Sequence, residues 1–563
     1  MFGPWPTMES PPDARRPRGE RAMKLLAALL FWFAIPGLAQ ETPVQLPEPR
    51  RPGSWDAAKV EHLWNRAAFG ATTQEIERWV PLGPEALVDR LLGGAGPDSE
   101  FEVKVYRVDR DLWNRSTNDE QIEMNRTAVH IHKGYISAYV QWWIQEMLTG
   151  PDPLRERMTL ILHDWLVSSF DKVDASDYCI NQSKLFRAHA LGNYGELLRQ
   201  VLRDPAMLVY LDNISNHKRK PNENLARELL ELFALGEGNY SEKDIQQAAR
   251  ALTGFTVRHE AFYFAVDMHD SEFKSVLGVS NRMAADELVG VLLDQEACAR
   301  YVAGRLIMEF EGLEPAEARL QEYARFLREN GYEFRPFLRR LFLDEAFYRE
   351  EVLGTKVLSP IEYLVGGARR IQSNASPRLL ELASGSLGQN LLHPPSVKGW
   401  DDGMAWITES SLMMRSNIWG VALREVDMVA LKASIDEAIE MMDTMMGDNP
   451  MGAEGKERSR GGPLARFLAD ASKEDLFVKL PIQAWIEGPA GRTDATLASF
   501  LLEEILAIPV PENTERRLRE ILAEGRKELG IPPGKYRNQL EKSEILIRRM
   551  VHWILSLPEA HLG

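Results

Sequence analysis

The chain has 563 residues, of which 44% are hydrophobic and 27% are charged. This composition is typical of a globular protein and excludes collagen-like, coiled-coil and largely disordered classes for most of the sequence. The net charge of −16 argues against a broad basic surface for nucleic acid or anionic lipid. Cys179 and Cys298 are too few for a disulfide framework or a cysteine-based zinc site. Whether they pair with each other stays open.

The N-terminus has the order of a secretory signal peptide. Basic residues precede an apolar run over 25–35, and small residues follow it up to Ala39. The run is shorter than the ~20 apolar residues of a membrane span. We therefore predict cleavage after Ala39, export to the periplasm or the extracellular space, and no membrane span in the mature chain. An uncleaved anchor helix is the alternative, and the sequence does not decide whether translation starts at Met1 or Met23.

The remainder of the chain divides by composition. Residues 40–54 are rich in proline and predict a linker. Helical periodicity dominates from Trp55, which predicts a helical core domain over 55–446. Glycine and proline over 447–463 predict a flexible linker, and 464–563 predict a C-terminal helical region.

A short β signal interrupts the helical pattern. Residues 262–266 are aromatic and apolar, and residues 274–277 follow after a polar turn. Together they predict one small hairpin. The expected fold is mainly α, with an irregular multi-helix core, one small β-hairpin and a C-terminal helical region.

Short motifs follow one another along the chain in a distinctive order. They are HLWNRAAFG (62–70), HALGNY (189–194), DPAML (204–208), YLD (210–212), NENLARELLEL (222–232), LTGF (252–255), HD (269–270), LGQ (387–389), HPP (393–395), KGW (398–400) and LPE (557–559). As a set they resemble the bacterial domain-of-unknown-function family numbered 1800, from about residue 57 to 420 and again at the C-terminus.

The resemblance implies a mostly helical, exported protein whose activity is unassigned. Members are often encoded beside a secreted sulfatase-like or phosphatase-like protein, which implies a partner rather than a reaction. The chain departs from the family at two positions where histidine is common, Trp165 and Phe233. Any metal role that rests on those two histidines is therefore not expected here.

The helix that begins near Asn222 carries the densest set of polar groups. Glu223, Arg227 and Glu231 are spaced i, i+4, i+8, so one guanidinium can meet two carboxylates. Glu228 and Glu231 could bridge a cation, or act as an acid and a base. Asn224 could orient a ligand on the same face. The alternative is a solvated face with weak surface ion pairs.

Three histidines are further candidates. His163 and His189 are predicted at helix ends, where the helix dipole favours a protonated histidine. His269 and Asp270 lie in the predicted hairpin turn, where an aspartate is commonly a turn former. Each has a catalytic or binding interpretation and a structural one.

A loop over 384–407 is rich in glycine, proline and tryptophan. Trp400 and Trp406 stand close to Asp401 and Asp402, which sets aromatic faces beside carboxylates. If exposed, the set could bind sugars or other stacked ligands; if buried, it is a plug that packs the loop on the core.

Two classes of function remain. The first is an exported scaffold that binds a secreted sulfatase-like or phosphatase-like partner, and it is the default. The second is an exported hydrolase that uses His163, Glu228, Glu231 and His269, with a divalent metal as an option. The sequence does not identify a metal or cofactor, but oxygen ligands would favour calcium, magnesium or manganese over zinc.

Overall fold

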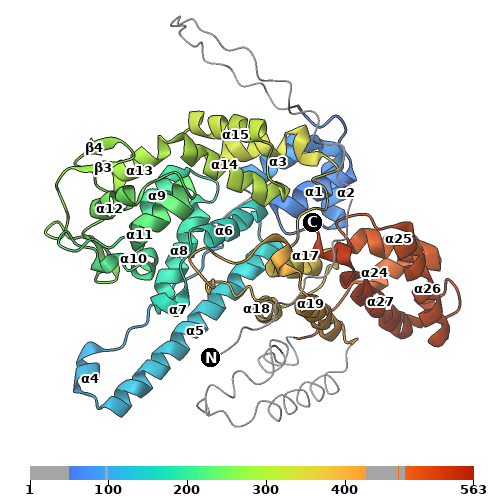
Figure 1. The fold of residues 1–563 in the computed structure, drawn as a ribbon. Helices are drawn as coiled ribbons and strands as arrows, with labels where there is room; N and C mark the ends of the chain where they lie inside the picture. The colour runs from blue at the N-terminus through green and yellow to red at the C-terminus, as the bar shows by residue number, and fades with distance from the viewer. Residues whose placement is uncertain (1–49, 95–98, 426–466, 468–475) are drawn as a thin grey trace, which may run out of the picture. The chain divides into compact units, whose positions relative to one another are not determined.

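The computed structural model describes residues 50–94, 99–425, 467 and 476–563 (Figure 1). These residues are mainly helical, with short strands in two places, so the predicted fold class is confirmed. The predicted signal peptide and the linker over 447–463 lie outside the described residues. The division into domains therefore stays a prediction.

In the first part of the chain the long helix α5 packs against α6 and α8 (Figure 1). Thr117 and Glu120 form a reciprocal capping box that starts α5, and Pro153 opens α6. The elements are α1 (Ala57–Ala67), α2 (Thr73–Trp79), η1 (Val80–Leu82), α3 (Gly83–Gly93), α4 (Arg110–Arg115), α5 (Asn118–Thr149), α6 (Pro153–Trp165), α7 (Phe170–Val173), α8 (Ser176–His189), α9 (Tyr194–Val201), α10 (Pro205–Tyr210) and η2 (Asn213–Ser215).

The middle of the chain continues the helical pattern. Here η3 is a π-helix that directly continues α11. The elements are α11 (Asn224–Glu228), η3 (Leu229–Leu235), α12 (Glu242–Ala251), α13 (Ala285–Leu293), α14 (Glu296–Glu311), α15 (Glu317–Glu329), α16 (Phe334–Phe342), η4 (Glu345–Tyr348), α17 (Pro360–Arg370), α18 (Pro377–Ser386), η5 (Gly403–Trp406) and α19 (Glu409–Ala422).

Two β-hairpins stand where one was predicted. Strand β1 (Phe255–Arg258) pairs with β2 (Ala261–Phe264), and β3 (Lys274–Val276) pairs with β4 (Val279–Asn281). The predicted pairing between the two β segments is therefore wrong, because each pairs with a neighbour across a two-residue turn. Both turns have positive φ at their two central residues, as type I′ hairpin turns require.

The C-terminal helices are joined to the preceding part of the chain by specific hydrogen bonds. The Tyr363 hydroxyl of α17 donates to the Leu555 carbonyl of α27 at 2.9 Å, and the Val478 amide donates to the Ala422 carbonyl at 3.0 Å. The elements are α24 (Ile482–Glu487), η6 (Pro489–Arg492), α25 (Asp494–Ile505), α26 (Glu512–Glu528), η7 (Tyr536–Gln539), α27 (Leu540–Leu555) and η8 (Pro558–His561).

One contiguous cluster of buried apolar side chains runs through these layers, from Val60 to Ala560. Cys179 and Cys298 are both buried and free in it, so they do not pair. None of the helices in the described ranges combines the length and the hydropathy that a membrane span requires.

Candidate functional site

The loop between α18 and η5, which contains the family-like motifs HPP and KGW, lies on the end of α6. The Leu392 amide donates to His163 Nε2 at 3.1 Å, and its carbonyl accepts from the Phe170 amide at 2.9 Å. The Trp400 amide donates to Asp164 Oδ1 at 2.8 Å. Segments far apart in the sequence are thereby fixed together, and the loop is held at two points.

His163 is a core residue rather than an accessible catalytic group. Its side chain is buried between the rings of Trp143 and Trp400, with centroids 5.9 and 5.3 Å away. Burial, with a smaller contribution from His393, lowers the pKa of His163 to about 3. The neutral ring accepts at Nε2, so Nδ1 carries the proton. At neutral pH the ring of His163 is therefore neutral, and its Nε2 holds the loop.

Asp164, the next residue, is the second anchor of the loop. Burial raises the pKa of Asp164 to about 7, although the Trp400 amide stabilises its ionised form. Gly399 approaches it with φ +87°, and a Cβ at this position would fall on Asp164 itself. Only glycine fits between the aspartate and the tryptophan that follows.

A row of polar contacts crosses the surface beside this anchor. His393 Nδ1 lies 2.9 Å from Asp171 Oδ1. Lys172, the next residue, donates to Asp212 Oδ2 at 2.8 Å. Asn224, at the start of α11, donates to the same oxygen at 3.3 Å. The row connects the loop to the predicted polar helix, which the sequence could not establish.

The polar face of α11 differs from its prediction because the helix changes type after Glu228. Arg227 makes a bidentate ion pair with Glu242 at 2.8 and 3.0 Å and lies 3.6 Å from Glu223. Glu231 instead accepts from the Tyr240 hydroxyl at 2.6 Å. The predicted bridge from Arg227 to Glu231 is wrong, since the wider π-helical turn shifts Glu231 away from the i+4 direction.

Glu228 keeps the environment expected of a carboxylate pair. It is half-buried, and burial together with the charge of Glu231 raises the pKa of Glu228, while Arg227 and Lys398 lower it. Lys398 belongs to the loop between α18 and η5, so loop and helix also meet electrostatically here. Within the described ranges, no group of three or more histidine, cysteine, aspartate or glutamate side chains is placed to hold a metal ion.

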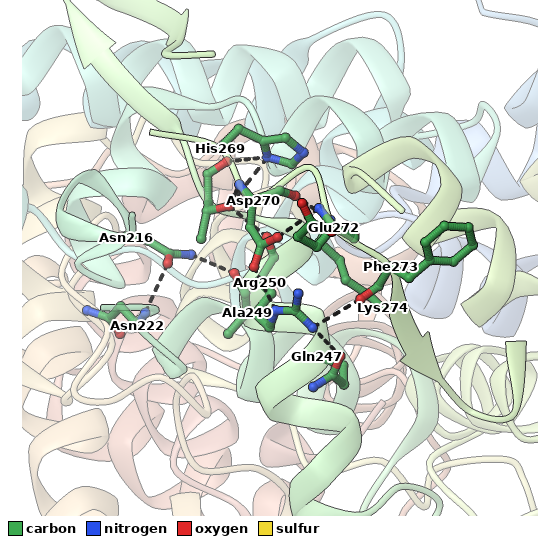
Figure 2. A network of polar contacts seen from close by, with 11 residues as sticks. Asn216, Asn222, Gln247, Ala249, Arg250, His269, Asp270, Glu272, Phe273 and Lys274 are labelled. Carbon is green, nitrogen blue, oxygen red and sulfur yellow. Dashed lines mark hydrogen bonds and ion pairs between the residues drawn. The ribbon is translucent and has the colours of Figure 1, made fainter. Parts of the chain in front are cut away.

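His269 and Asp270 belong to a separate structural network (Figure 2). His269 Nδ1 lies 2.8 Å from the Thr253 carbonyl oxygen, and the Thr253 hydroxyl accepts from the Asp270 amide at 2.8 Å. Arg250 Nε donates to Asp270 Oδ2 at 2.7 Å. Lys274, which is buried, donates to the Asp270 carbonyl. These contacts pin the β2–β3 connection to α12, which supports the turn-forming interpretation of both residues.

The same network stabilises the ionised form of Asp270. Burial opposes its ionisation, but hydrogen bonds from Arg250 and from the Glu272 amide hold the pKa of Asp270 below its ordinary value. Burial lowers the pKa of Lys274, and Asp270 opposes that shift. None of the hydrogen bonds described for His269 or Asp270 reaches a residue of α11, so the structure does not join them to Glu228 and Glu231.

The remaining predicted binding residues fall in three different environments. His189 is the last residue of α8 and partly buried, and its carbonyl accepts from the Gly192 amide at 3.0 Å. Trp400 is buried, which makes it the plug that was one of its two interpretations. Trp406 is partly exposed and lines a surface hollow of about 490 Å³ with Met413 and Asp401.

Asp212 and Lys398 are site residues that chemical reasoning from the sequence missed. Each stands inside a family-like motif, so the motif is the signal, but nothing in the spacing connects either one to α11.

The two departures from the family lie in adjoining segments of the core. Trp165 Nε1 donates to the Leu232 carbonyl at 2.9 Å, and Phe233 is buried beside that carbonyl.

Comparison with known proteins gives a family without an activity. Neither a curated protein nor a solved structure matches the chain. A family model does match, over residues 62–562, and this range contains both anchors of the loop and the whole of α11. The chain therefore belongs to the family described as protein of unknown function (DUF1800).

Proposed function

We propose that this chain is an exported binding protein whose partner docks on the surface formed by η5 and the start of α19. The observation that carries the proposal is the hydrogen bonding of the polar side chains around the loop between α18 and η5. His163 and Asp164 bond the loop that leads to η5, and Arg227 and Glu231 are already paired. The side chains of His163 and Asp164 thus serve to hold this loop in place.

The loop held in this way presents apolar side chains to solvent. Met404 and Met413 are 71% and 67% exposed, and Met413 lines the hollow with Trp406. Exposed methionine beside a tryptophan is common at adaptable protein-binding surfaces. We call Asp401, Asp402, Met404, Trp406 and Met413 the η5 surface.

The charge on the η5 surface indicates the chemistry of the partner. Asp401 and Asp402 are exposed at its edge, and among the described residues neither lysine nor arginine lines the hollow. A partner segment that inserts an apolar side chain and carries a flanking basic residue would complement it. The family resemblance suggests a secreted sulfatase-like or phosphatase-like protein, and the N-terminal sequence supports a shared location outside the cytoplasm.

The test is a binding titration between the purified chain and a secreted sulfatase-like or phosphatase-like protein of the kind that the family resemblance implies. We expect the double variant Met404→Glu, Met413→Glu to bind at least tenfold more weakly, because two charges would be buried in the interface. Met308→Glu is the matched control, since Met308 is 41% exposed on α14, which contributes no residue to the η5 surface. Equal affinity of the double variant and the unchanged chain would contradict the proposal.

A second candidate is hydrolysis, and the environment of Glu228 favours it. A half-buried carboxyl with a raised pKa beside Glu231 and Lys398 resembles an acid held near an anion-binding cation. The same purified chain can be assayed on aryl sulfate and aryl phosphate esters. Turnover that disappears in Glu228→Gln, with unchanged thermal stability, would favour this candidate over the first.

A further inference from the structure

A cavity of about 620 Å³ lies between the N-terminal helices and α25, and it shares no lining residue with the η5 surface or with α11. Its floor is formed by α1 and α2, and its other walls by α25 and the segment that follows. Most of the wall is apolar, and the larger apolar side chains are those of Ile76, Leu353, Phe500, Leu502, Leu506, Ile508 and Val510. A cavity of this size and character is typical of a small-molecule site.

The charged residues that line the cavity are all acidic. They are Glu61, Glu503, Glu504 and Glu515, and within the described part of the chain neither lysine nor arginine lines it. Glu504 accepts from the Thr73 hydroxyl and from Gln372 Nε2, the latter at 2.5 Å. Glu504 is therefore already satisfied by groups of the protein.

Glu515, which also lines the cavity, has its hydrogen-bond and ion-pair partners within the protein as well. It accepts from the Ser499 hydroxyl at 2.7 Å and pairs with Arg519. Glu503 is exposed on α25, where water can solvate it. Of these four side-chain carboxylates, Glu61 is thus the one that a ligand in the cavity would pair with.

Glu61 is partly buried, and among the residues that the structure describes it makes neither a hydrogen bond nor an ion pair. The nearby guanidinium of Arg370 donates instead to Asn65 Oδ1 at 2.8 Å. Burial raises the pKa of Glu61 to about 7, with Arg370 opposing and Glu504 adding to the shift. The ionised form of a buried carboxylate without a counter-ion is stabilised by any cation that enters the cavity.

His62, beside Glu61, does not compete for that role. Its Nε2 lies 3.0 Å from the Phe347 carbonyl oxygen, so Nε2 carries the proton and Nδ1 is an acceptor. Burial lowers the pKa of His62 to about 3, so the ring is neutral and does not repel a cation. Glu61 and His62 together offer acceptors and no positive charge.

We propose that this cavity binds an organic cation with an apolar body, such as a primary alkylammonium, whose charged group pairs with Glu61. The apolar walls take up the body, and Glu61 replaces water around the ammonium group. Binding in this form requires Glu61 to be ionised, so a proton leaves Glu61 when the cation binds near neutral pH.

Calorimetric titration with n-octylammonium, n-octanol and octanoate tests the proposal on the full chain. We expect octylammonium to bind more tightly than the other two, and about tenfold more tightly at pH 8 than at pH 6. Glu61→Gln should lose at least tenfold in affinity at pH 8 and lose the pH dependence. Glu503→Gln, which changes a solvated carboxylate of the same wall, should keep both.

A second variant separates binding from folding. Ala507→Trp narrows the cavity without changing Glu61, and it should abolish octylammonium binding while a thermal melt shows a folded protein. Three results would each overturn the proposal. They are octanoate binding as tightly as octylammonium, unchanged affinity in folded Glu61→Gln, and no octylammonium binding at pH 8.

Discussion

The Trp400 amide donates a hydrogen bond to Asp164 Oδ1 across 236 positions of sequence. The contact joins the end of α6 to the loop that carries η5, and Gly399 has to be a glycine for the two to approach. A second bond, from the Leu392 amide to His163, fixes the start of the same loop. The placement of the η5 surface depends on these two bonds.

Replacement of Gly399 by alanine should release the loop. The substitution forces a residue with a side chain into a positive φ and also places a methyl group on Asp164. Gly403→Ala is the matched control, because its φ is +53° and no atom of the described residues lies within 4 Å of where a Cβ would stand. We expect Gly399→Ala to lower the melting temperature by several degrees more than Gly403→Ala. Similar melting temperatures would show that the close approach does not matter.

Asp164 should make stability depend on pH in a specific direction. In the unfolded chain an aspartate ionises near pH ~3.9, whereas in the folded chain the pKa of Asp164 is about 7. Between these values the folded state retains a proton that the unfolded state has lost. The free energy of unfolding therefore falls as pH rises through this window, and the loss is complete above about pH 7.

Asp164→Asn removes that ionisation while it keeps an acceptor for Trp400. The melting temperature of the variant, relative to the unchanged chain, should therefore rise between about pH 5 and pH 8. Asp401→Asn is the control, because Asp401 is exposed. The melting temperature of this variant relative to the unchanged chain should not vary with pH. A constant difference for Asp164→Asn would contradict the assignment.

Arg227 and Arg157 should respond differently to replacement by leucine. Arg227 pairs with Glu242 at the surface, so its loss should shift the melting temperature by less than about 1 °C. Arg157 is buried and pairs with Glu309 and Glu362. Its loss removes the nearest cation of the buried Glu362, which then keeps Lys356 at 3.3 Å, and breaking a buried ion pair costs about 3–5 kcal/mol. Thermal melts of the two variants decide this, and equal shifts would refute the distinction.

Asp270→Ala should destabilise the protein and leave partner binding unchanged once folded. The substitution removes the acceptor of Arg250 and the charge beside Lys274, both in the network of Figure 2. We expect a loss of about 2–4 kcal/mol. Asp267→Ala, which changes an exposed aspartate of the same connection, should have almost no effect. Chemical denaturation of both variants measures the difference.

Periodicity is enough to predict the helical fold and the inner face of α11 and η3. Leu225 and Leu229 are fully buried, as their spacing indicates. The pairing of the strands is not predictable from side-chain pattern, because it depends on backbone conformation. His259 with Glu260, and Leu277 with Gly278, adopt positive φ without the Asn-Gly signal that marks such turns.

The candidate site is only partly predictable for similar reasons. The end-of-helix position of His163 is correct, but its burial depends on Leu392, Trp143 and Trp400, which come from distant segments. Arg227 pairs with Glu242 because a π-helix follows α11, and no local residue pattern announces the change of helix type. Long-range contacts decide both outcomes.

The most direct test of the central claim is hydrogen–deuterium exchange of the chain with and without the sulfatase-like or phosphatase-like partner that we propose. If the partner docks on the η5 surface, amides over 403–414 should exchange more slowly in the complex, while those over 222–242 should not change. Protection over 222–242 with none over 403–414 would contradict the proposal and would place the partner at Glu228 and Glu231 instead.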